Sequence, residues 1–465
     1  MKIAFHGAAR AVTGSKHLIT LNNGTKILLD CGLFQGMGDI TDQLNESFGF
    51  NPAKVTYLIL SHAHIDHCGL LPRLVAEGFS GTIYCTPATK DLAEILMLDS
   101  AKIQMQDAEY QNKKNKQPGF HAIPLYTDID VQQTISQFKT VPYEQDFKID
   151  DHITVRFTDA GHIVGSAAVH LQINEDGKET HVTFSGDVGR YGDLLLKSPQ
   201  TFPQADYIIL ESTYGDSLHV DVEAIENLLL QIITQTCIEK QGKIIIPAFS
   251  VGRTQELLYA LNSLELKGRL PDIPYYVDSP LSMEATQVLK DHPDVYNNGV
   301  KEIMKVDRDI FDFKGLRFIE SVEESKALNN DPQPCVIISS SGMAEGGRVR
   351  HHIKNNISDR KNTILMVGYA SPGSLAGRLV SGQKRVWLFG QDYDVIAEVR
   401  SIKSMSAHGD YEDLLQFLTG QDPTKVRQIF LVHGEYDVQL KFAERVHNAG
   451  FQNVAIPEYH QEFEL

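Results

Sequence analysis

One short stretch of the chain gathers an unusual density of side chains that bind metals. Within residues 61–69 the sequence holds three histidines and one aspartate: His62, His64, Asp66 and His67. Neutral imidazole and carboxylate are the ligands that zinc and similar ions prefer. On a loop, the first two histidines can bind one ion while the aspartate and the last histidine turn towards a second. We therefore predict a metal centre here rather than a solvated polar loop.

This stretch must be positioned by the element before it. Residues 55–60 are mostly apolar and read as a buried strand. A loop that leaves a strand is where a rigid scaffold can aim side chains into a cleft. Ligand-type residues recur at the ends of other apolar runs: Asp30, His162, Asp187 and His433. Each of these alone is better explained by a capped turn, but together with residues 61–69 they indicate one shared centre.

Size and composition restrict the class of protein. The chain has 465 residues, of which 42% are hydrophobic and 22% charged, as expected for a globular protein of two domains. The start lacks the long apolar core of a secretion signal, and no run approaches the roughly 18 apolar residues of a membrane span. The five cysteines are scattered and never spaced as CxxC, which is typical of a reducing compartment. We therefore expect a cytoplasmic protein without membrane attachment.

The net charge of −17 argues, taken alone, against a protein that binds nucleic acid. Two effects weaken that objection. Bound metal neutralises some carboxylates, and a local basic groove can coexist with an acidic remainder. The net charge therefore leaves nucleic acid open as a partner.

The order of predicted elements indicates an inserted domain. Up to about residue 211 the sequence reads as strands and hairpins, with helices over 70–76 and 89–111. From 212 to 393 helices and buried strands alternate, beginning with a helix over 222–239, which is typical of an α/β sheet. Short strands and two helices return from 394. The simplest architecture is one domain built from both ends of the chain, 1–211 and 394–465, with a second at 212–393.

The whole pattern resembles a known family, the metallo-β-lactamase fold hydrolases and among them the β-CASP nucleases. The four motifs of the fold are matched in order by Asp30, the loop from His62 to His67, His162 and Asp187. The three motifs of the β-CASP branch are matched by Glu211, His408 and His433. Residues 247–256, 341–348 and 368–375 also look like that branch. The chain is most similar in kind to bacterial members that resemble the endonuclease of messenger-RNA 3′-end formation.

The resemblance implies an α/β fold, a metallo-β-lactamase αββα sandwich with an inserted α/β β-CASP domain. It also implies two zinc ions, with manganese as the alternative. The ligands of the first ion would be His62, His64 and His162, those of the second Asp66, His67 and His433, and Asp187 would bridge the two. Asp30 would lie behind these residues and orient them through hydrogen bonds.

The resemblance further implies hydrolysis of RNA phosphodiester bonds by a two-metal mechanism. Its catalytic residues would be Asp66, Glu211 and His408, with His408 as the general acid and Glu211 as its hydrogen-bond partner. Histidine at position 433 favours RNA over DNA. The partner would be an RNA substrate, and a homodimer is an alternative to a monomer. Two other functions stay open: a hydrolase of small thioesters or similar molecules, and a catalytically silent RNA-binding paralogue.

Several residues of the inserted domain are candidates for contact with phosphate or RNA. They are Ser340, Ser341, Gly342, Arg253, Arg348 and Arg378. Glycine and serine after a strand can cradle a phosphate through backbone amides, and arginines can line a groove. An ordinary turn and ordinary surface positions explain the same residues about as well.

Overall fold

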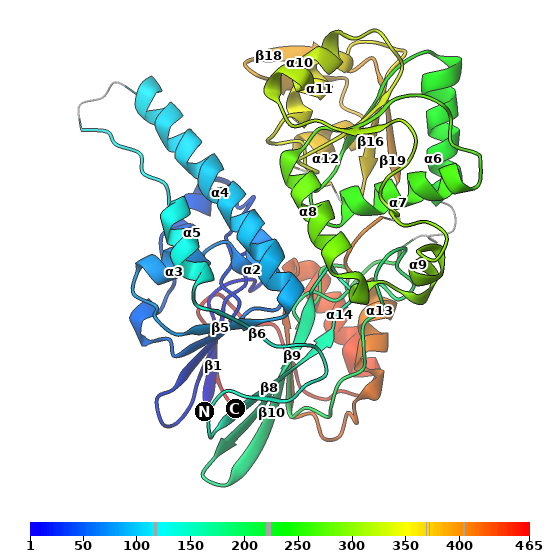
Figure 1. Cartoon of the computed structure of the whole chain (residues 1–465). Coiled ribbons are helices and arrows are strands. Elements are labelled where there is room, and N and C mark those ends of the chain that lie inside the picture. Colours follow the sequence, from blue (N-terminus) through cyan, green and yellow to red (C-terminus); the bar gives the residue numbers. More distant parts are fainter. Residues whose placement is uncertain (116–118, 220–224, 369, 372, 403–404) are drawn as a thin grey trace. The chain divides into compact units, whose positions relative to one another are not determined.

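The computed structural model describes residues 1–115, 119–219, 225–368, 370–371, 373–402 and 405–465. They form two compact units. The first contains Met1–Tyr191, Lys197–Leu218 and His408–Leu465, and the second contains Gly192–Leu196 and His219–Ala407. In Figure 1 the blue, cyan and red segments share the first unit, while the second is green to orange. The second unit is therefore an insertion into the first.

Two seven-stranded sheets form the centre of the first unit. One has the order β22-β1-β2-β3-β4-β5-β6. Its strands are β1 (Lys2–Phe5), β2 (His17–Thr20), β3 (Lys26–Leu29), β4 (Tyr57–Ile59), β5 (Thr82–Cys85), β6 (Phe138–Thr140) and β22 (Glu462–Glu464). The pairing is antiparallel from β22 to β3 and parallel from β3 to β6.

The other sheet has the order β21-β20-β11-β10-β9-β8-β7. Its strands are β7 (Phe147–Lys148), β8 (Ile153–Asp159), β9 (Ala167–Glu175), β10 (Lys178–Phe184), β11 (Tyr207–Glu211), β20 (Gln428–Val432) and β21 (Val454–Ala455). Strands β7 to β10 pair antiparallel, and β10, β11, β20 and β21 pair in parallel. The parallel pairing of β11 with β20 joins the two ends of the chain across the insertion.

The two sheets pack face to face around one apolar layer. Alternate residues of their strands point into it, among them Phe5, Ile27, Phe157, Val169 and Phe430, and all are buried. Removal of this apolar surface from water is the main force that holds the sandwich together. This packing holds the carboxyl ends of the strands in fixed positions.

Helices cover the outer faces of the sandwich. On the side of the first sheet lie α3 (Leu71–Ala76), α4 (Pro87–Lys114) and α5 (Asp128–Ile135) (Figure 1). Against the second sheet, α13 (Tyr411–Phe417) and α14 (Tyr436–Asn448) pack through apolar side chains. Shorter helical turns are α1 (Thr41–Asn45), α2 (Ile65–Cys68), η1 (Gly38–Ile40), η2 (Pro52–Lys54) and η6 (Leu418–Gly420). The predicted αββα sandwich is confirmed.

The second unit is built on a six-stranded parallel sheet with the order β14-β13-β15-β12-β16-β19. Its strands are β12 (Ile244–Pro247), β13 (Tyr275–Val277), β14 (Leu316–Phe318), β15 (Val336–Ser339), β16 (Thr363–Val367) and β19 (Glu398–Ile402). Its helices are α6 (Ile225–Ile233), α7 (Arg253–Leu266), α8 (Pro280–Asp291), α9 (Asn298–Ile303), α10 (Val322–Asn330), α11 (Val349–Asn356) and α12 (Leu375–Val380), with a short turn η5 (Pro293–Val295). A separate hairpin joins β17 (Arg385–Leu388) to β18 (Gln391–Asp394). This is the α/β architecture that the alternating pattern predicts.

The structure differs from the sequence prediction at three places. The chain returns to the first unit at His408, later than residue 394, because β19 pairs in parallel with β16. Of the helix predicted over 222–239, residues 222–224 lie outside the described residues, and α6 continues into a π-helical turn, Thr234–Glu239. The sequence prediction also lacks α5, the elements between 267 and 330 and the final strand β22, although α10 begins with a capping box from Ser321 to Glu324.

Candidate metal centre

The predicted ligands gather at one edge of the sandwich because each follows the end of a strand. Asp30 follows β3, and residues 61–67 follow β4. In the second sheet, His162 follows β8, Asp187 follows β10 and His433 follows β20. All of these residues lie in the first unit. β3 pairs in parallel with β4, and β10, β11 and β20 pair in parallel. β8 runs in the same direction as β10 because β9 lies antiparallel between them, so these strand ends come together at one edge.

The donor atoms of the first predicted ligand set are spaced closely enough to share one ion. His64 Nδ1 lies 3.2 Å from His62 Nε2 and 3.1 Å from His162 Nε2. Asp187 Oδ2 lies 3.4 Å from His62 Nε2 and 3.5 Å from His162 Nε2. Four ligands bonded to zinc at 2.0–2.1 Å stand about 3.3 Å apart. One proton on His64 Nδ1 can serve only one of its two nitrogen neighbours, so a shared cation fits this cluster better than hydrogen bonds.

The second predicted ligand set lies beside the other carboxylate oxygen of Asp187. Asp187 Oδ1 is 3.3 Å from His67 Nε2, and His433 Nε2 is 3.3 Å from Asp66 Oδ2. The donor atoms of Asp66, His67 and His433 lie within 4.8 Å of one another. Asp187 therefore faces the first set with one oxygen and the second set with the other, as a bridging ligand must.

Two orphaned atoms test whether a cation fits between these groups. His67 Nε2 and Asp187 Oδ1 are buried and have no hydrogen-bond partner among the described residues. A buried polar atom without a partner costs roughly 1–3 kcal/mol. A cation bound by both atoms removes that cost, so the residues present fit a metal.

Electrostatics point the same way. Burial, reinforced by His67, lowers the pKa of His62 to about 3, and burial lowers the pKa of His64 to about 4 against the opposing charge of Asp66. These two imidazoles are therefore neutral at pH 7, which is the form that binds metal. Burial alone would also lower the pKa of His67, but the carboxylates of Asp187, Asp30 and Asp66 raise it. A dication would balance those carboxylates in place of the His67 proton.

Asp30 holds the ligands from behind. Its Oδ2 accepts hydrogen bonds from His67 Nδ1 at 2.6 Å and from the Ser61 hydroxyl at 2.7 Å, and its Oδ1 accepts the Ser61 amide at 2.7 Å. Because Nδ1 of His67 donates to Asp30, its Nε2 carries the lone pair that a cation needs. The role of Asp30 as a residue that orients metal ligands stays a prediction.

The short helix α2, which carries Asp66 and His67, is fastened to the neighbouring loops through its backbone. Its carbonyl groups accept amide hydrogen bonds from Ser15 at 2.8 Å, Cys31 at 2.7 Å and Leu33 at 2.9 Å. Two ligand-region residues, Asp30 and His433, have positive φ angles of 57° and 50°. Such backbone conformations are unfavourable outside glycine and persist where the surrounding structure imposes them. The surrounding structure thus fixes these residues in backbone conformations that are unfavourable by themselves.

His408 and Glu211 stand beside the metal ligands. Glu211 Oε1 accepts a hydrogen bond from His408 Nδ1 at 3.1 Å and another from the Val188 amide at 2.7 Å. The His408 ring centroid is 4.5 Å from that of His162. Burial lowers the pKa of His408, but the charge and hydrogen bond of Glu211, with Asp187 and Asp66, outweigh it and raise the pKa to about 9. A protonated histidine at neutral pH can act as a general acid.

The start of α13 fixes where His408 lies. The Asp410 carboxylate accepts the amides of Glu412 and Asp413, which caps the helix. The Gly409 amide donates to the Val188 carbonyl at 2.7 Å. A Cβ atom at position 409 would lie 2.8 Å from the Gly189 carbonyl oxygen, so only glycine allows this close approach.

Two contributors were not assigned a role from the sequence. Thr213 Oγ1 lies 3.0 Å from His433 Nδ1, which leaves Nε2 of that ring to face Asp66. The Ser166 hydroxyl accepts the His162 amide at 3.0 Å and so shapes the turn that presents His162. Both residues lie close in sequence to predicted ones, but small hydroxyl side chains at strand ends are too common to signal a role.

The candidate phosphate or RNA contacts lie in the second unit, after β15 and near α7, α11 and α12. Ser340 Oγ is 3.0 Å from Ser279 Oγ, and the Ser341 amide donates to the Gly346 carbonyl at 3.4 Å, while Gly342 packs beside Phe249. The arginines have carboxylate partners: Arg253 is buried and pairs with Glu256, Arg348 pairs with Asp278 at 2.7 Å, and Arg378 is 3.7 Å from Glu345. Their role in binding phosphate remains a prediction.

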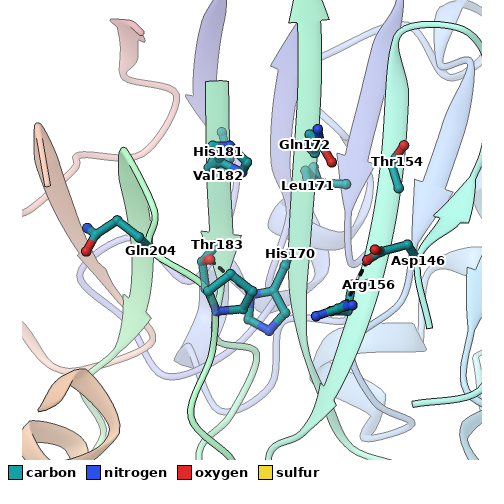
Figure 2. Close-up of a pocket in the computed structure, with 11 residues that line it drawn as sticks. Asp146, Thr154, Arg156, His170, Leu171, Gln172, His181, Val182, Thr183 and Gln204 are labelled. Carbon is teal, nitrogen blue, oxygen red and sulfur yellow. Dashed lines mark hydrogen bonds and ion pairs between the residues drawn. The ribbon is translucent and has the colours of Figure 1, made fainter. Parts of the chain in front are cut away.

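A polar pocket of about 170 Å³ on the second sheet of the first unit is not this centre (Figure 2). It contains Arg156, paired with Asp146 at 2.8 Å, and His170. Both ring nitrogens of His170 are bonded to threonine hydroxyls, at 2.8 Å to Thr158 and 3.0 Å to Thr183. Neither nitrogen is left for a metal or a substrate, so this histidine is structural.

The fold and the ligand geometry together define a metallo-hydrolase. Family models match three segments: "Metallo-beta-lactamase superfamily" over residues 12–231, "Beta-Casp domain" over 254–379 and "Zn-dependent metallo-hydrolase RNA specificity domain" over 392–457. The chain belongs to the metallo-β-lactamase superfamily, in its β-CASP family.

Three known proteins illustrate this relationship. Ribonuclease TTHA0252 of Thermus thermophilus is 34% identical over 443 residues, 95% of this chain and 94% of that protein. Transcription termination factor FttA of Methanosarcina mazei is 32% identical over 434 residues, 91% of this chain and 65% of the longer relative. A crystal structure of a protein of unknown function from Enterococcus faecalis V583 aligns with a TM-score of 0.54 at 12% identity, over 100% of this chain and 99% of that one. The last likeness concerns the fold alone.

Proposed function

We propose that the protein hydrolyses phosphodiester bonds of RNA at this centre, with two zinc ions as the cofactor and manganese as the alternative. The observation that supports this most is Asp187, which presents one oxygen to each of two ligand sets while the His408–Glu211 pair stands beside them. When bound, two cations neutralise a phosphodiester and make a shared water more acidic. The similarity to a relative named ribonuclease supports RNA as the substrate.

In this proposal the chain's own residues divide the work. His62, His64 and His162 would hold the first ion, Asp66, His67 and His433 would hold the second, and Asp187 would contact both. Asp30 keeps His67 in the tautomer that binds metal through its 2.6 Å hydrogen bond. Glu211 keeps His408 protonated, and His408 gives its Nε2 proton to the leaving oxygen of the cleaved bond. Asp66, which would hold the second ion, is the third catalytic residue of this proposal beside Glu211 and His408.

The domain roles follow from where these groups lie. The hydrolytic chemistry belongs to the metallo-β-lactamase domain, which the sequence places at 1–211 and 394–465. The β-CASP domain, placed at 212–393, contributes contacts to phosphate or RNA through Ser340, Ser341, Gly342, Arg253, Arg348 and Arg378. A phosphate near Arg348 or Arg378 would compete with the carboxylates that these arginines contact.

No helix among the described residues is long and apolar enough to cross a membrane. We infer a cytoplasmic location from the cysteines, because all five are free and buried, as expected in a reducing compartment. A homodimer is tested by light scattering on the purified protein.

The test of the function is cleavage of one single-stranded RNA labelled at either end, beside its DNA counterpart, with zinc and with manganese. Internal fragments from RNA mean an endoribonuclease, and mononucleotides from one end mean an exonuclease. His408→Ala is the matched variant: it should lose turnover and keep its metal. If the protein holds two metals and cuts neither polymer, the proposal is wrong and hydrolysis of a small molecule becomes the better interpretation.

A further inference from the structure

The charge of the second unit is unevenly distributed. From the start of α11 to the end of β19, residues 349–402, the sequence has eight Lys and Arg and four Asp and Glu, a net charge of +4 in a chain of net charge −17. A local basic segment in an acidic protein indicates a surface for a polyanion. This segment contains the β17–β18 hairpin.

Exposed aromatic side chains project from that hairpin. Trp387, the single tryptophan of the sequence, is 60% exposed, and Phe389 is 43% exposed. On the inner side of β17, Val386 and Leu388 are buried in the core of the second unit. The hairpin is therefore anchored on one face of β17, presents Trp387 to solvent on the other, and carries the partly exposed Phe389 in its turn.

Cationic side chains from α11 surround Phe389. The guanidinium of Arg350 lies 4.8 Å and the ammonium of Lys354 lies 5.6 Å from the centre of its ring. The His351 ring is nearly parallel to it, with centroids 4.5 Å apart. Aromatic rings flanked by cations are what single-stranded nucleic acid needs, because bases stack on the rings while phosphates meet the charges.

Two acidic side chains of the hairpin, both already counted in the net charge of +4, reduce the local positive charge without cancelling it. Asp394 is paired with Arg385 at 2.8 Å, and Asp392 lies opposite Trp387 in the hairpin register. Lys384 precedes β17 and is exposed. The surface thus keeps a positive excess next to its aromatic rings, which favours a polyanion over an ordinary protein partner.

The turn of the hairpin places a non-glycine residue in an unfavourable backbone conformation. Phe389 and Gly390 form a two-residue connection with positive φ angles of 49° and 80°. Asparagine, aspartate or glycine is preferred at the first position of such a turn, and a bulky aromatic residue there is an outlier. An unfavourable residue retained at an exposed tip indicates a role for its side chain outside the fold.

We propose that Trp387, Phe389, Arg350, Lys354 and Lys384 form a binding surface for single-stranded RNA, the hairpin surface, on which bases stack and phosphates pair with the cations. The proposal rests on the proposed ribonuclease function, since it names a second place where that substrate is held.

The single tryptophan provides the direct measurement. Full-length His408→Ala protein, loaded with zinc, is titrated with a 20-nucleotide polyuridine while the fluorescence of Trp387 and the anisotropy of a labelled end are recorded together. We expect saturable quenching that follows binding. Heparin, a polyanion without bases, should bind without comparable quenching.

Two variants separate the hairpin surface from the fold. Phe389→Asn places a favoured residue in the turn, which offsets the loss of the ring contacts with α11, so its melting temperature should change little, while RNA affinity falls about 5- to 100-fold through lost stacking. Lys354→Gln should reduce the slope of log affinity against log salt by about 0.7, as for one phosphate contact on a single strand. Lys305→Gln, at an exposed lysine outside the hairpin surface, is the matched control and should change neither.

The outcomes distinguish this inference from the proposed function. Binding without any change in Trp387 fluorescence, equal quenching by heparin, or unchanged affinity in Phe389→Asn would each overturn the hairpin surface even if RNA is cleaved. A change of Trp387 fluorescence with protein concentration, in the absence of RNA, would mean that the hairpin surface is a contact between copies of the chain. Quenching in His408→Ala together with no cleavage by the wild-type protein would support the hairpin surface and contradict the proposed ribonuclease function. With both correct, Phe389→Asn in otherwise wild-type protein raises KM and leaves kcat unchanged.

Discussion

Glu211 and His408 are 197 positions apart in the chain, yet Glu211 Oε1 accepts a hydrogen bond from His408 Nδ1 at 3.1 Å. The pair joins the end of β11 to the start of α13, on either side of the inserted unit. The carboxylate is fully buried and also accepts the Val188 amide, so its position is fixed. A fixed carboxylate behind an imidazole sets both the orientation and the proton affinity of that imidazole.

Removal of the Glu211 charge should move the alkaline limit of activity. Glu211 raises the pKa of His408 to about 9, and a general acid works only below its pKa. Glu211→Gln keeps an acceptor oxygen but loses the charge. The fall of kcat at high pH should then begin about one to three pH units lower than in the wild type.

The pH profile of kcat for the two proteins, at saturating metal, measures this shift. His408→Gln should show no fall of kcat at high pH and serves as the control. An alkaline limb that stays in place in Glu211→Gln means that another group is the acid.

Asp187→Asn should remove metal and activity together. Asp187 Oδ2 and Oδ1 face different ligand sets, and asparagine keeps only one oxygen, because its amide nitrogen donates hydrogen bonds and offers no lone pair to a metal. Loss of a supporting group typically costs 10–100-fold in affinity or activity, so loss of the bridge should cost more than about 100-fold. Metal content by elemental analysis and cleavage rate are measured on one preparation. His152→Asn, at an exposed histidine, should keep both, and an active Asp187→Asn protein would disprove the bridge.

Gly409→Ala should slow turnover and leave the metal bound. The added Cβ would stand 2.8 Å from the Gly189 carbonyl oxygen and would displace the segment that carries His408. A misplacement of about 1 Å can cost on the order of 100-fold in rate. Gly420→Ala, where the new Cβ has no neighbour closer than 3.7 Å, is the matched control near the other end of α13. Equal kcat in both variants would remove the positioning role of Gly409.

Asp278→Asn should destabilise the second unit in a way that depends on pH. Burial raises the pKa of Asp278, but hydrogen bonds from His352, Ser325 and Arg348 outweigh it, and the net pKa lies below the ordinary value. A carboxyl group with a lowered pKa stabilises the fold above its unfolded pKa of about 3.9, and this contribution disappears as the pH falls through the folded pKa. At pH 7 the substitution should cost about 3–5 kcal/mol, because it breaks a buried network.

Thermal unfolding from pH 7 to pH 3 measures this effect. The gap between wild type and Asp278→Asn should narrow as the pH drops below about 4. Asp272→Asn, at a side chain that is 79% exposed and pairs with Lys314 at the surface, should cost no more than about 1 kcal/mol. A gap that is the same at both ends of the pH range would mean that the Asp278 charge contributes nothing.

The sequence alone determined the local part of the centre. The spacing of residues 62–67 after a buried run defines which side chains leave one strand end together, because six consecutive residues cannot spread their ligands far. Apolar runs ahead of Asp30, His162, Asp187 and His433 marked further strand ends, and these residues do lie at one edge of the sandwich. Local spacing and hydrophobic pattern are properties of a short segment, so a single sequence carries them.

Tertiary structure alone decided which distant residues pair. The contacts of Asp30 with His67, of Thr213 with His433 and of Glu211 with His408 depend on strand order, register and the packing of two sheets. The same dependence assigns β19 to the second unit and presents Trp387 to solvent while Val386 is buried. These pairings span 37 to 220 positions, and no local pattern encodes them, because they form only when the burial of all the apolar faces is satisfied at once.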